Sequence, residues 1–297
     1  MTTVGIIGLG RMGLPIARNI LERGFPVVGY RRSSSGELTA LGGTVVSSAS
    51  EVASASDVII SILPDTGALE EVVLGPSGTL TRLRPGTVHI EMSTLDVSDK
   101  SRIRDAVQSA GGDMLDCPIS GTPAMVAPRV ATTFVSGDLS SVDAVRHVLD
   151  AISGAWVYSG AFGAGARLKY VANLLVAVHT VAAAEALLLA RRSGLDLDLV
   201  QETLTGSIAS STIWERRGPM IRDRKWTPAP GPISTLHLIL EQIEAQANGV
   251  DVALPVFAAA KQLFDKALAD GWGDLDIAAV HDQLSGQNPS LRDAESP

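Results

Sequence analysis

The sequence predicts an α/β fold in which a doubly wound parallel sheet is followed by an all-helical domain. Short apolar runs alternate with helix-like stretches up to about residue 162, and only helical patterns follow. The runs are apolar on both faces, which is typical of parallel strands covered by helices on each side. We therefore expect one domain at 1–162, a helical domain at 163–285 and a flexible tail at 286–297.

The first half supplies strand and helix candidates in alternation. The strand candidates are "TVGIIGLG", "PVVGYRR", "ASDVIISILP", "GTVHIEMST", "GGDMLDCPIS" and "ATTFVSGD". Helical spacing with a glycine stop marks "LPIARNILERG", and "SGELTALGG" is typical of a short helix. Strands that alternate with helices predict βαβ units, and such units build a parallel sheet.

The second half consists of helical patterns at 166–191, 196–206, 234–248 and 255–270. A proline-rich connection, 225–234, interrupts them. The first helix is apolar nearly all round, which is typical of a helix buried in a core or between subunits. Asn173, His179 and Thr180 break its apolar run, so we expect it to be too short to span a bilayer.

The composition limits the partners and the compartment. With a formal net charge of -8 and no basic cluster, the chain is poorly suited to bind nucleic acid. Its one cysteine, Cys117, cannot form an internal disulfide, which is typical of a reducing compartment. The five histidines lack metal-ligand spacing, and the first residues do not resemble a signal peptide. We expect a cytoplasmic protein that binds neither nucleic acid nor a membrane nor a metal.

The first motif is "GIIGLGRMG", in which Gly8, Gly10 and Gly13 form the pattern G-x-G-x-x-G. Alone this pattern is weak, because a structural glycine turn also produces it. Here a strand candidate precedes it and a helix candidate follows. In that context Gly8 allows a tight turn, Gly10 lets a pyrophosphate approach the backbone and Gly13 permits close helix packing. The motif therefore predicts a dinucleotide-binding turn with phosphate at a helix N-terminus.

The end of the second strand candidate indicates which dinucleotide binds. A site for NAD usually has an acidic residue about 20 residues after the glycines, on the ribose 2′-hydroxyl. This chain has no acid there; the stretch is Tyr30, Arg31, Arg32 and Ser33. Two guanidinium groups and a hydroxyl suit a 2′-phosphate, and the alternative is a solvated basic loop. We expect NADPH or NADP rather than NADH.

Two further stretches place hydroxyl groups at strand ends. Ser93 and Thr94 end "EMST", on the side of an open α/β sheet where ligands bind. "DCPISGTPAM" places Ser120, Gly121 and Thr122 in a loop, where hydroxyl and backbone N–H groups suit a carboxylate or carbonyl. Composition alone favours an ordinary turn for the second stretch.

Lys169 opens the long apolar run, and Asn173 follows four residues later. On a helix these two side chains share a face. Burying an unpaired ammonium costs several kcal/mol, so a lysine here either extends to water or performs chemistry. Its position directly after a dinucleotide-binding half favours a catalytic role.

Four blocks resemble, in order and spacing, the β-hydroxyacid dehydrogenases, the group of 3-hydroxyisobutyrate dehydrogenase and tartronate-semialdehyde reductase. They are "GIIGLGRMGLPIARNI", "EMST", "DCPISGTPA" and "GAGARLKYVANLL", and with "AEALLLARRSGLDLDLV" they cover nearly the whole chain. The resemblance implies a Rossmann-type N-terminal domain, a long interdomain helix and an all-helical C-terminal domain that dimerises. The assembly would then be a homodimer or a dimer-based tetramer.

The resemblance also implies roles for the matching residues. Lys169 matches the catalytic lysine, and Asn173 matches an asparagine that helps to hold the substrate. The implied substrate-binding residues are Ser120, Gly121, Thr122 and Thr94. The implied cofactor-binding residues are Gly8, Leu9, Gly10, Arg11, Met12, Gly13, Tyr30, Arg31, Arg32, Ser33, Leu63, Pro64, Ser93 and Thr94.

Three departures from the family pattern bear on the substrate. Thr122 stands where the family usually has a second glycine, and Ala172 where it usually has an asparagine. The family's Lys-Asp-Leu motif is missing from "STLHLILEQ" (234–242), where Leu236 and His237 stand nearby. The cleft thereby loses two charges, so we expect a substrate that is larger or less polar than a small hydroxy acid.

Three functions compete. The first is NADP(H)-dependent interconversion of a semialdehyde or keto acid and a β-hydroxy acid, with Lys169 as general acid and base. The second is imine reduction, since "DCPISGTPAMV" and "HLILEQIEAQANGVDVALP" also resemble imine reductases. Imine reductases generally lack a lysine at the position of Lys169, which favours the dehydrogenase. The third is a non-enzymatic nucleotide-binding protein, which fold alone does not exclude.

Overall fold

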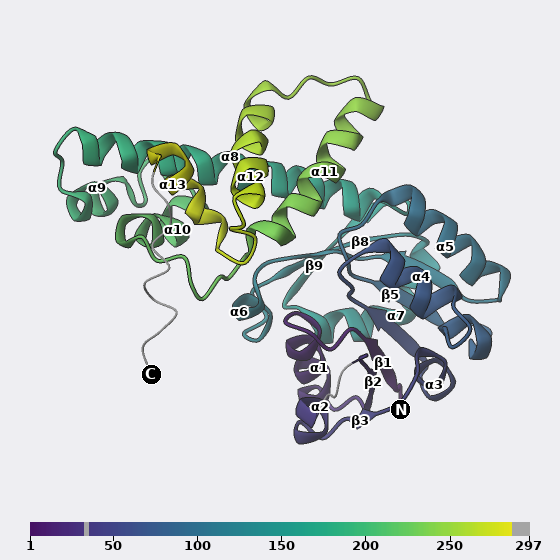
Figure 1. The fold of residues 1–297 in the computed structure, drawn as a ribbon. Coiled ribbons are helices and arrows are strands. Elements are labelled where there is room, and N and C mark those ends of the chain that lie inside the picture. Colours follow the sequence, from purple (N-terminus) through teal and green to yellow (C-terminus); the bar gives the residue numbers. More distant parts are fainter. Residues whose placement is uncertain (33–35, 287–297) are drawn as a thin grey trace. The chain divides into compact units, whose positions relative to one another are not determined.

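The computed structural model describes residues 1–32 and 36–286 and divides the chain into two compact units, Met1–Lys169 and the chain from Tyr170 onward (Figure 1). The α/β class predicted from the sequence is confirmed. The predicted domain boundary after residue 162 stays a prediction. All but the first residue of the predicted tail lie outside the described residues.

A sheet with nine strands in the described residues forms the centre of the first unit (Figure 1). The strands are β1 (Val4–Ile7), β2 (Val27–Tyr30), β3 (Thr44–Val45), β4 (Val58–Ser61), β5 (Val88–Glu91), β6 (Asp113–Asp116), β7 (Ile119–Ser120), β8 (Thr132–Ser136) and β9 (Ala155–Gly160). Their order is β3-β2-β1-β4-β5-β6-β8-β7, with β9 paired to β8. Strands β1 to β6 are parallel, and the chain reverses its direction of progress between β1 and β4. Ligands of doubly wound sheets bind at this switch point, outside the carboxyl ends of the strands.

The predicted parallel sheet is present in β1 to β6, and one edge of the sheet departs from it. Strand β8 runs antiparallel to β6, where Asp116 pairs with Ser136, and antiparallel to β7. The connection from β7 to β8 contains only the four-residue helix α6 (Pro123–Val126), which is too short for a parallel crossover. Sequence pattern also misses β3, which has two residues, and β9, whose side chains are mostly exposed.

Helices cover both faces of the sheet, as the apolar strands require (Figure 1). The remaining helices of this unit are α1 (Gly13–Glu22), α2 (Gly36–Ala40), α3 (Ala49–Ala55), α4 (Thr66–Leu74), the 3-10 helix η1 (Thr79–Arg82), α5 (Val97–Ser109) and α7 (Leu139–Ile152). Helices α1 and α7 cover one face, and α3, α4 and α5 cover the other. Val58 and Ile60 of β4 belong to the first core, whereas Ile59 between them belongs to the second. Strand β4 thus contributes alternate residues to two cores.

Helices make up the described part of the second unit. Helix α8 (Ala164–Arg192) begins in the first unit and continues into the second. The others are α9 (Leu197–Leu204), α10 (Thr212–Asp223), α11 (Ile233–Gly249), α12 (Pro255–Ala269), the 3-10 helix η2 (Ile277–Ala279) and α13 (Val280–Ser285). All four predicted helices are present, and the proline-rich stretch lies between α10 and α11. The pattern misses the short α13 and also α10, because Gly218 and Pro219 within α10 are typical helix breakers.

Helix α8 is long and apolar enough, by length and composition, to cross a membrane. Its most apolar 18-residue window has a mean hydropathy of 1.8, and 39% of that window is buried. The prediction that this run is too short to span a bilayer is therefore wrong as a statement about length. The core helix of a soluble protein meets the same criterion of length and composition.

Candidate functional site

The predicted cofactor residues follow the carboxyl ends of neighbouring parallel strands. Gly8 follows β1, Leu63 follows β4 and Ser93 follows β5. Because β1, β4 and β5 are parallel neighbours in register, these residues lie at one edge of the sheet. The switch point between β1 and β4 lies at the same edge, so the first unit assembles its candidate site there.

The glycine turn between β1 and α1 fits a pyrophosphate. Gly8 has a φ of +99°, and a Cβ on it would lie 2.1 Å from the carbonyl oxygen of Ile62. A Cβ on Gly13 would lie 1.9 Å from the carbonyl oxygen of Gly8, so α1 starts against the turn. A Cβ on Gly10 would have no atom within 4 Å, which leaves its backbone open to a ligand. Met12, the N-cap residue of α1, gives the helix no side-chain cap.

The three glycines therefore meet the three requirements of a dinucleotide-binding turn. Gly8 makes the tight turn, Gly10 leaves its backbone open, and Gly13 lets the helix pack closely. Among the other predicted residues of the turn, Leu9 is buried in the core and Arg11 is exposed. The start of α1, which has no side-chain cap, is the positive end of the helix dipole and favours an anion.

The arginines after β2 lie beside this turn. Arg31 Nη1 donates a hydrogen bond to the carbonyl oxygen of Leu9 at 3.2 Å and lies 3.7 Å from Glu37. Arg32 Nη1 lies 3.8 Å from a carboxylate oxygen of Glu71, and both arginines are exposed. Tyr30 ends β2, and its carbonyl oxygen accepts a hydrogen bond from Gly8 N at 3.1 Å. The fourth predicted residue of this stretch, Ser33, lies outside the described residues.

Ser93 connects the turns that follow two strands. Its Oγ accepts a hydrogen bond from Leu63 N at 2.8 Å, and its own N donates to Glu91 Oε1 at 2.8 Å. Ser93 is buried, and Thr94 is half-buried beside it. Pro64, the other predicted residue after β4, is exposed. The positions of Ser93 and Leu63 are thus fixed by the same hydroxyl.

The predicted substrate loop is more ordered than expected. Ser120 is the last residue of β7 and pairs with Thr132 of β8. Thr122 is the N-cap residue of α6, and a Cβ on Gly121 would lie 2.8 Å from Cβ of Ala131. The prediction of a loop is therefore wrong for Ser120 and correct for the residues after it. All three predicted residues, 120 to 122, are half-buried.

Lys169 and Asn173 occupy successive turns of α8 and share a face of it. The two residues are 8% and 6% exposed. Burial lowers the pKa of Lys169 to about 8, and no ion pair of this lysine occurs among the residues that the structure describes. The Nδ2 atom of Asn173 is buried and has no hydrogen-bond partner within the described chain. Within the described residues, a buried ammonium without an ion pair and a buried amide nitrogen without a hydrogen-bond partner are suited to a polar ligand.

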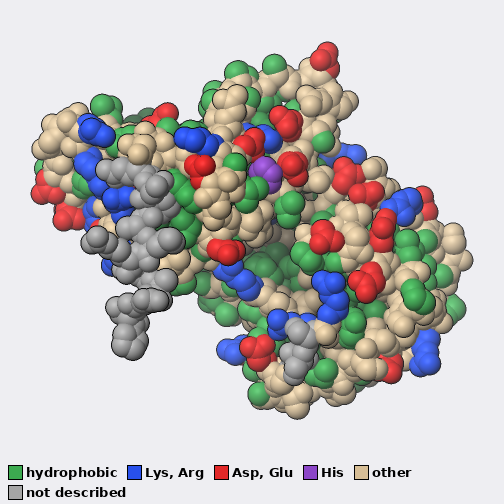
Figure 2. Space-filling view, in the orientation of Figure 1, with side chains coloured by type: hydrophobic (Ala, Val, Ile, Leu, Met, Phe, Trp, Pro, Cys, Tyr) green, Lys and Arg blue, Asp and Glu red, His purple; other side chains and the backbone are tan. Residues whose placement is uncertain are grey.

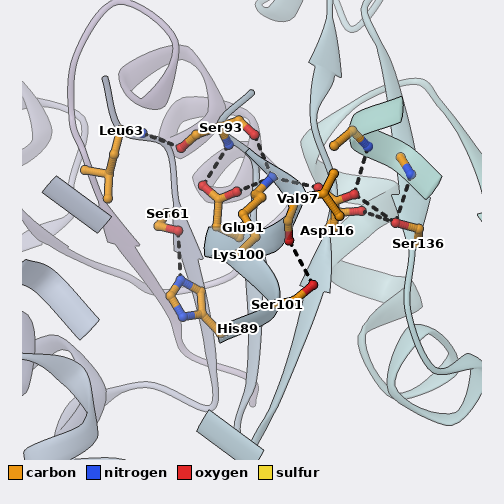
Figure 3. Close-up of polar contacts among 12 residues, drawn as sticks. Ser61, Leu63, His89, Glu91, Ser93, Val97, Lys100, Ser101, Asp116 and Ser136 are labelled. Atoms are coloured by element: carbon orange, nitrogen blue, oxygen red, sulfur yellow. Dashed lines mark hydrogen bonds and ion pairs between the residues drawn. The ribbon is translucent and has the colours of Figure 1, made fainter. Parts of the chain in front are cut away.

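A buried cluster at the ends of β5 and β6 was not predicted as part of the site (Figure 3). Lys100 of α5 is fully buried, with Nζ 2.5 Å from Glu91 Oε2 and 2.6 Å from Asp116 Oδ1. Nζ also donates a hydrogen bond to the carbonyl oxygen of Ser93 at 2.7 Å. Burial opposes the charge of Lys100, but the two carboxylates outweigh it and raise its pKa above the ordinary value. Burial raises the pKa of Glu91, against the opposing effect of Lys100.

One signal in the sequence points to this cluster. Glu91 and Asp116 are the last residues of two apolar strands and stand opposite each other in register. Acidic side chains that end adjacent buried strands need a buried cation or a ligand. The stretches "EMST" and "DCPIS" contain both acids, but the prediction from sequence uses only the hydroxyl-bearing residues of these regions.

The stretch that lacks the Lys-Asp-Leu motif lies in α11. Leu236 is buried in the helical core, and His237 points to acidic neighbours. Its Nδ1 lies 3.1 Å from Asp265 Oδ1, and its Nε2 lies 3.4 Å from Glu241 Oε1. His237 therefore lies close to two carboxylates of the second unit, although its Nδ1 has no hydrogen-bond partner among the described residues.

Two family models match successive parts of the chain. One, the NAD binding domain of 6-phosphogluconate dehydrogenase, matches residues 3–160, which is more than half of the chain. The other, the NAD-binding region of NADP-dependent 3-hydroxyisobutyrate dehydrogenase, matches residues 163–284. The chain belongs to the β-hydroxyacid dehydrogenase family. The predicted family is confirmed, and with it the oxidoreductase class and a nicotinamide dinucleotide cofactor.

Several characterised relatives match over nearly their full length. L-threonate dehydrogenase of Cupriavidus necator is 31% identical, with 93% of this chain and 94% of the relative covered. 2-Hydroxy-3-oxopropionate reductase of Escherichia coli is 32% identical, with 93% of this chain and 95% of the relative covered. Both are named for small hydroxy acids or their oxidised forms.

The solved structures agree with this membership. 3-Hydroxyisobutyrate dehydrogenase from Salmonella typhimurium superposes with a TM-score of 0.87 at 28% identity and covers 95% of this chain and 100% of its own. An imine reductase from Pseudomonas sp. also superposes, with a TM-score of 0.62 at 22% identity over 95% of this chain and 99% of its own. At that identity the second match shows a shared fold alone.

Proposed function

We propose that this β-hydroxyacid dehydrogenase uses NADP(H) to interconvert a semialdehyde or keto acid and a β-hydroxy acid, with Lys169 as the general acid and base. The observation that supports it best is the state of Lys169. This lysine is buried, its pKa is lowered to about 8, and it belongs to the same unit as the glycine turn. A buried group with a pKa near the working pH is suited to proton transfer.

The proposed chemistry divides hydride and proton transfer between cofactor and protein. Bound NADPH supplies the hydride. In reduction, protonated Lys169 gives its Nζ proton to the substrate oxygen as the alcohol forms, and in oxidation the neutral amine takes that proton back. Asn173 Nδ2, which has no hydrogen-bond partner in the described part of the chain, donates a hydrogen bond to the substrate. Ser120 and Thr122 hold the substrate's acyl group with their hydroxyl groups.

The choice of NADP(H) rests on the arginines after β2. Arg31 is tied to the glycine turn through Leu9, and Arg32 lies next to it with an exposed guanidinium. Replacing both with alanine removes two charged donors, so we expect the KM for NADPH to rise about 10- to 100-fold while the KM for NADH changes little. Arg18→Ala, an exposed arginine on α1, is the matched control. Equal effects on both nucleotides would refute the NADP preference.

The proposed size and polarity of the substrate follow from the positions at which the sequence departs from the family pattern. Because α11 lacks the family's lysine and aspartate, we propose a substrate that is larger or less polar than 3-hydroxyisobutyrate. The test is NADPH consumption over a panel of semialdehydes, keto acids and cyclic imines, with NADH and the Lys169→Ala variant as controls. A second panel of small β-hydroxy acids is assayed in the opposite direction, by NADPH formation from NADP. High activity on 3-hydroxyisobutyrate in that panel would overturn this proposal about size and polarity.

Imine reduction is the second candidate, favoured by the shared fold and by the missing Lys-Asp pair. The same panel decides between the two. Turnover of cyclic imines but not of aldehydes or keto acids assigns the chain to imine reduction. Binding of NADPH without turnover of any substrate would instead support the third reading, a nucleotide-binding protein without catalysis.

We also propose a soluble cytoplasmic protein that assembles as a homodimer or a dimer-based tetramer. Exposed apolar side chains follow one another along α8, where Val171, Leu175 and Leu189 are 57%, 47% and 69% exposed. Such a stripe suits a second copy of the chain. Basic and acidic side chains are mixed over the face shown in Figure 2, which gives nucleic acid no continuous basic surface there. Light scattering after gel filtration measures the assembly, and a monomer at micromolar concentration would refute it.

A further inference from the structure

We infer that Asp116 and Ser136 are positioning residues for Lys169, because they fix the first turn of α8 to the sheet, and that Lys100 links this anchor to Ser93. The inference rests on the catalytic role proposed for Lys169. All the residues involved belong to the first unit.

Side chains of two strands accept hydrogen bonds from the first turn of α8. The first N–H groups of any helix lack partners within the helix. Here Gly165 N donates to Ser136 Oγ at 2.9 Å, and Ala166 N donates to Asp116 Oδ2 at 2.8 Å. Ser136 Oγ in turn donates to Asp116 Oδ2 at 3.0 Å. The two caps therefore form one hydrogen-bonded unit whose side chains come from β6 and β8.

The helix also approaches the strands too closely for a side chain. A Cβ on Gly165 would lie 2.5 Å from the carbonyl oxygen of Phe134 and 2.9 Å from that of Asp116. Lys169 follows Ala166 by three residues, so it lies one turn beyond the anchored N–H groups. Because the first turn of α8 is held this closely, Lys169 in the next turn has little freedom to move relative to the sheet.

The carboxylate of Asp116 has a second partner that connects it to the cofactor edge. Its Oδ1 is paired with Lys100 Nζ, which also donates to the carbonyl oxygen of Ser93. Glu91 contacts the same two residues, since it pairs with Lys100 and accepts a hydrogen bond from Ser93 N. Ser93 and the start of α8 are thus fixed to the same buried ammonium. The network sets the separation between the cofactor edge and the catalytic lysine.

The geometry of a reaction is sensitive to small displacements, since about 1 Å can cost on the order of 100-fold in rate. Loss of the anchor should therefore lower kcat more than it changes nucleotide binding. A residue with only a structural role would lower stability and leave kcat unchanged. The two roles differ in a measurable way.

The test compares Ser136→Ala with Ser153→Ala. Both remove one buried hydroxyl, but Ser153 bonds to Thr133 Oγ1 of β8 at 3.0 Å and to the carbonyl oxygen of Ala155, with no bond to α8. We expect Ser136→Ala to lower kcat about 10-fold or more, with the Kd for NADPH within about twofold of wild type. Ser153→Ala should lower the melting temperature by a similar amount and keep kcat. Gly165→Ala, which pushes α8 away from β8, should reproduce the kcat loss.

Hydrogen exchange of the amides at 165–170 measures the anchor without turnover. Faster exchange in Ser136→Ala than in Ser153→Ala supports the inference. Equal exchange, or a wild-type kcat in Ser136→Ala at matched melting temperature, would overturn it. Lys169→Ala separates this failure from a failure of the proposed function. If Lys169→Ala is inactive while Ser136→Ala behaves like the control, only the positioning role is wrong; if Lys169→Ala keeps its activity, the catalytic role itself is wrong.

Discussion

Two lysines of the first unit are buried to a similar degree, yet their surroundings shift their pKa values in opposite directions. Lys100 is fully buried between Glu91 and Asp116, and these carboxylates raise its pKa. Lys169 is 8% exposed, and burial lowers its pKa to about 8. Burial penalises both ammonium groups; the difference lies in the counterions.

The comparison teaches which buried charge is structural and which is available for chemistry. A lysine held by two carboxylates stays charged and joins the elements that surround it. A lysine without a counterion can release its proton near neutral pH and therefore suits a general acid or base. One domain uses the same residue type for both purposes, and the two sites connect through Asp116 and the first turn of α8.

The largest expected effect is on turnover, in Lys169→Met. Methionine keeps most of the volume and removes the proton donor, so kcat should fall by about 10²- to 10⁴-fold. The free energy of unfolding at pH 7 should stay level or rise, because no carboxylate of residues 1–32 and 36–286 pairs with this buried ammonium. Steady-state kinetics and urea unfolding on the same preparation measure the two quantities. Lost activity together with lost stability would place Lys169 with Lys100 as a structural residue.

The second effect is on stability, in Lys100→Met. This change leaves Glu91 and Asp116 buried without their cation, and breaking such a pair costs about 3–5 kcal/mol. We expect the free energy of unfolding to fall by that amount, as measured by urea unfolding, and the variant to refold poorly. Lys225→Met, an exposed lysine, is the control and should change stability little. A Lys100→Met protein as stable as wild type would show that the two carboxylates are protonated or hydrated and do not depend on the lysine.

These two lysines also show how far the sequence alone reaches. Lys169 was predicted because a lysine at the start of an apolar helix is visible locally, as are the glycines of the turn. Lys100 was not, because it stands in "VSDKSRIRDAV", a charged helix in which one lysine looks like any other surface residue. Its partners lie in two other elements, and only the folded sheet brings them together.

The same limit applies to the fold. The alternation of apolar runs predicted the doubly wound sheet and the two layers of helices, because each run carries its own periodicity. It did not predict the direction of β8 or the helix α10. Strand direction depends on connection length and pairing, and the Gly218-Pro219 sequence is overridden by packing in the helical unit. Asn173 was predicted from its spacing, but its unpartnered Nδ2 became visible only in the structure.

The third effect is on the pH dependence of catalysis. Reduction requires protonated Lys169, so its kcat/KM should be constant below the pKa near 8 and fall about tenfold per pH unit above it. Oxidation requires the neutral amine, so its kcat/KM should rise with pH up to the same pKa and then level off. Rates in both directions from pH 6 to 10 measure this. In Lys169→Met the residual rate should lack that inflection, and an inflection that persists there belongs to another group.

The smallest expected effect is on stability as a function of pH, and it tests the comparison without any substrate. The pKa of Lys169 is about 8 in the folded protein and near the ordinary 10.5 in the unfolded chain. Below pH 8 both states are protonated, and folding carries the full cost of burying the charge. Between pH 8 and 10.5 the folded protein binds fewer protons than the unfolded chain, so stability rises with pH across this window.

Wild type should therefore gain stability relative to Lys169→Met over that window, by up to about 3 kcal/mol. Lys100 adds nothing to the difference, since its raised pKa keeps it protonated in the folded state and the same residue is present in both proteins. Urea unfolding of the pair at pH 7, 8.5 and 10 measures the gap, and the shared titrations of other groups cancel. A gap that stays constant with pH would mean that Lys169 keeps its proton in the folded state as firmly as Lys100 does, and the two lysines would then belong to one structural class.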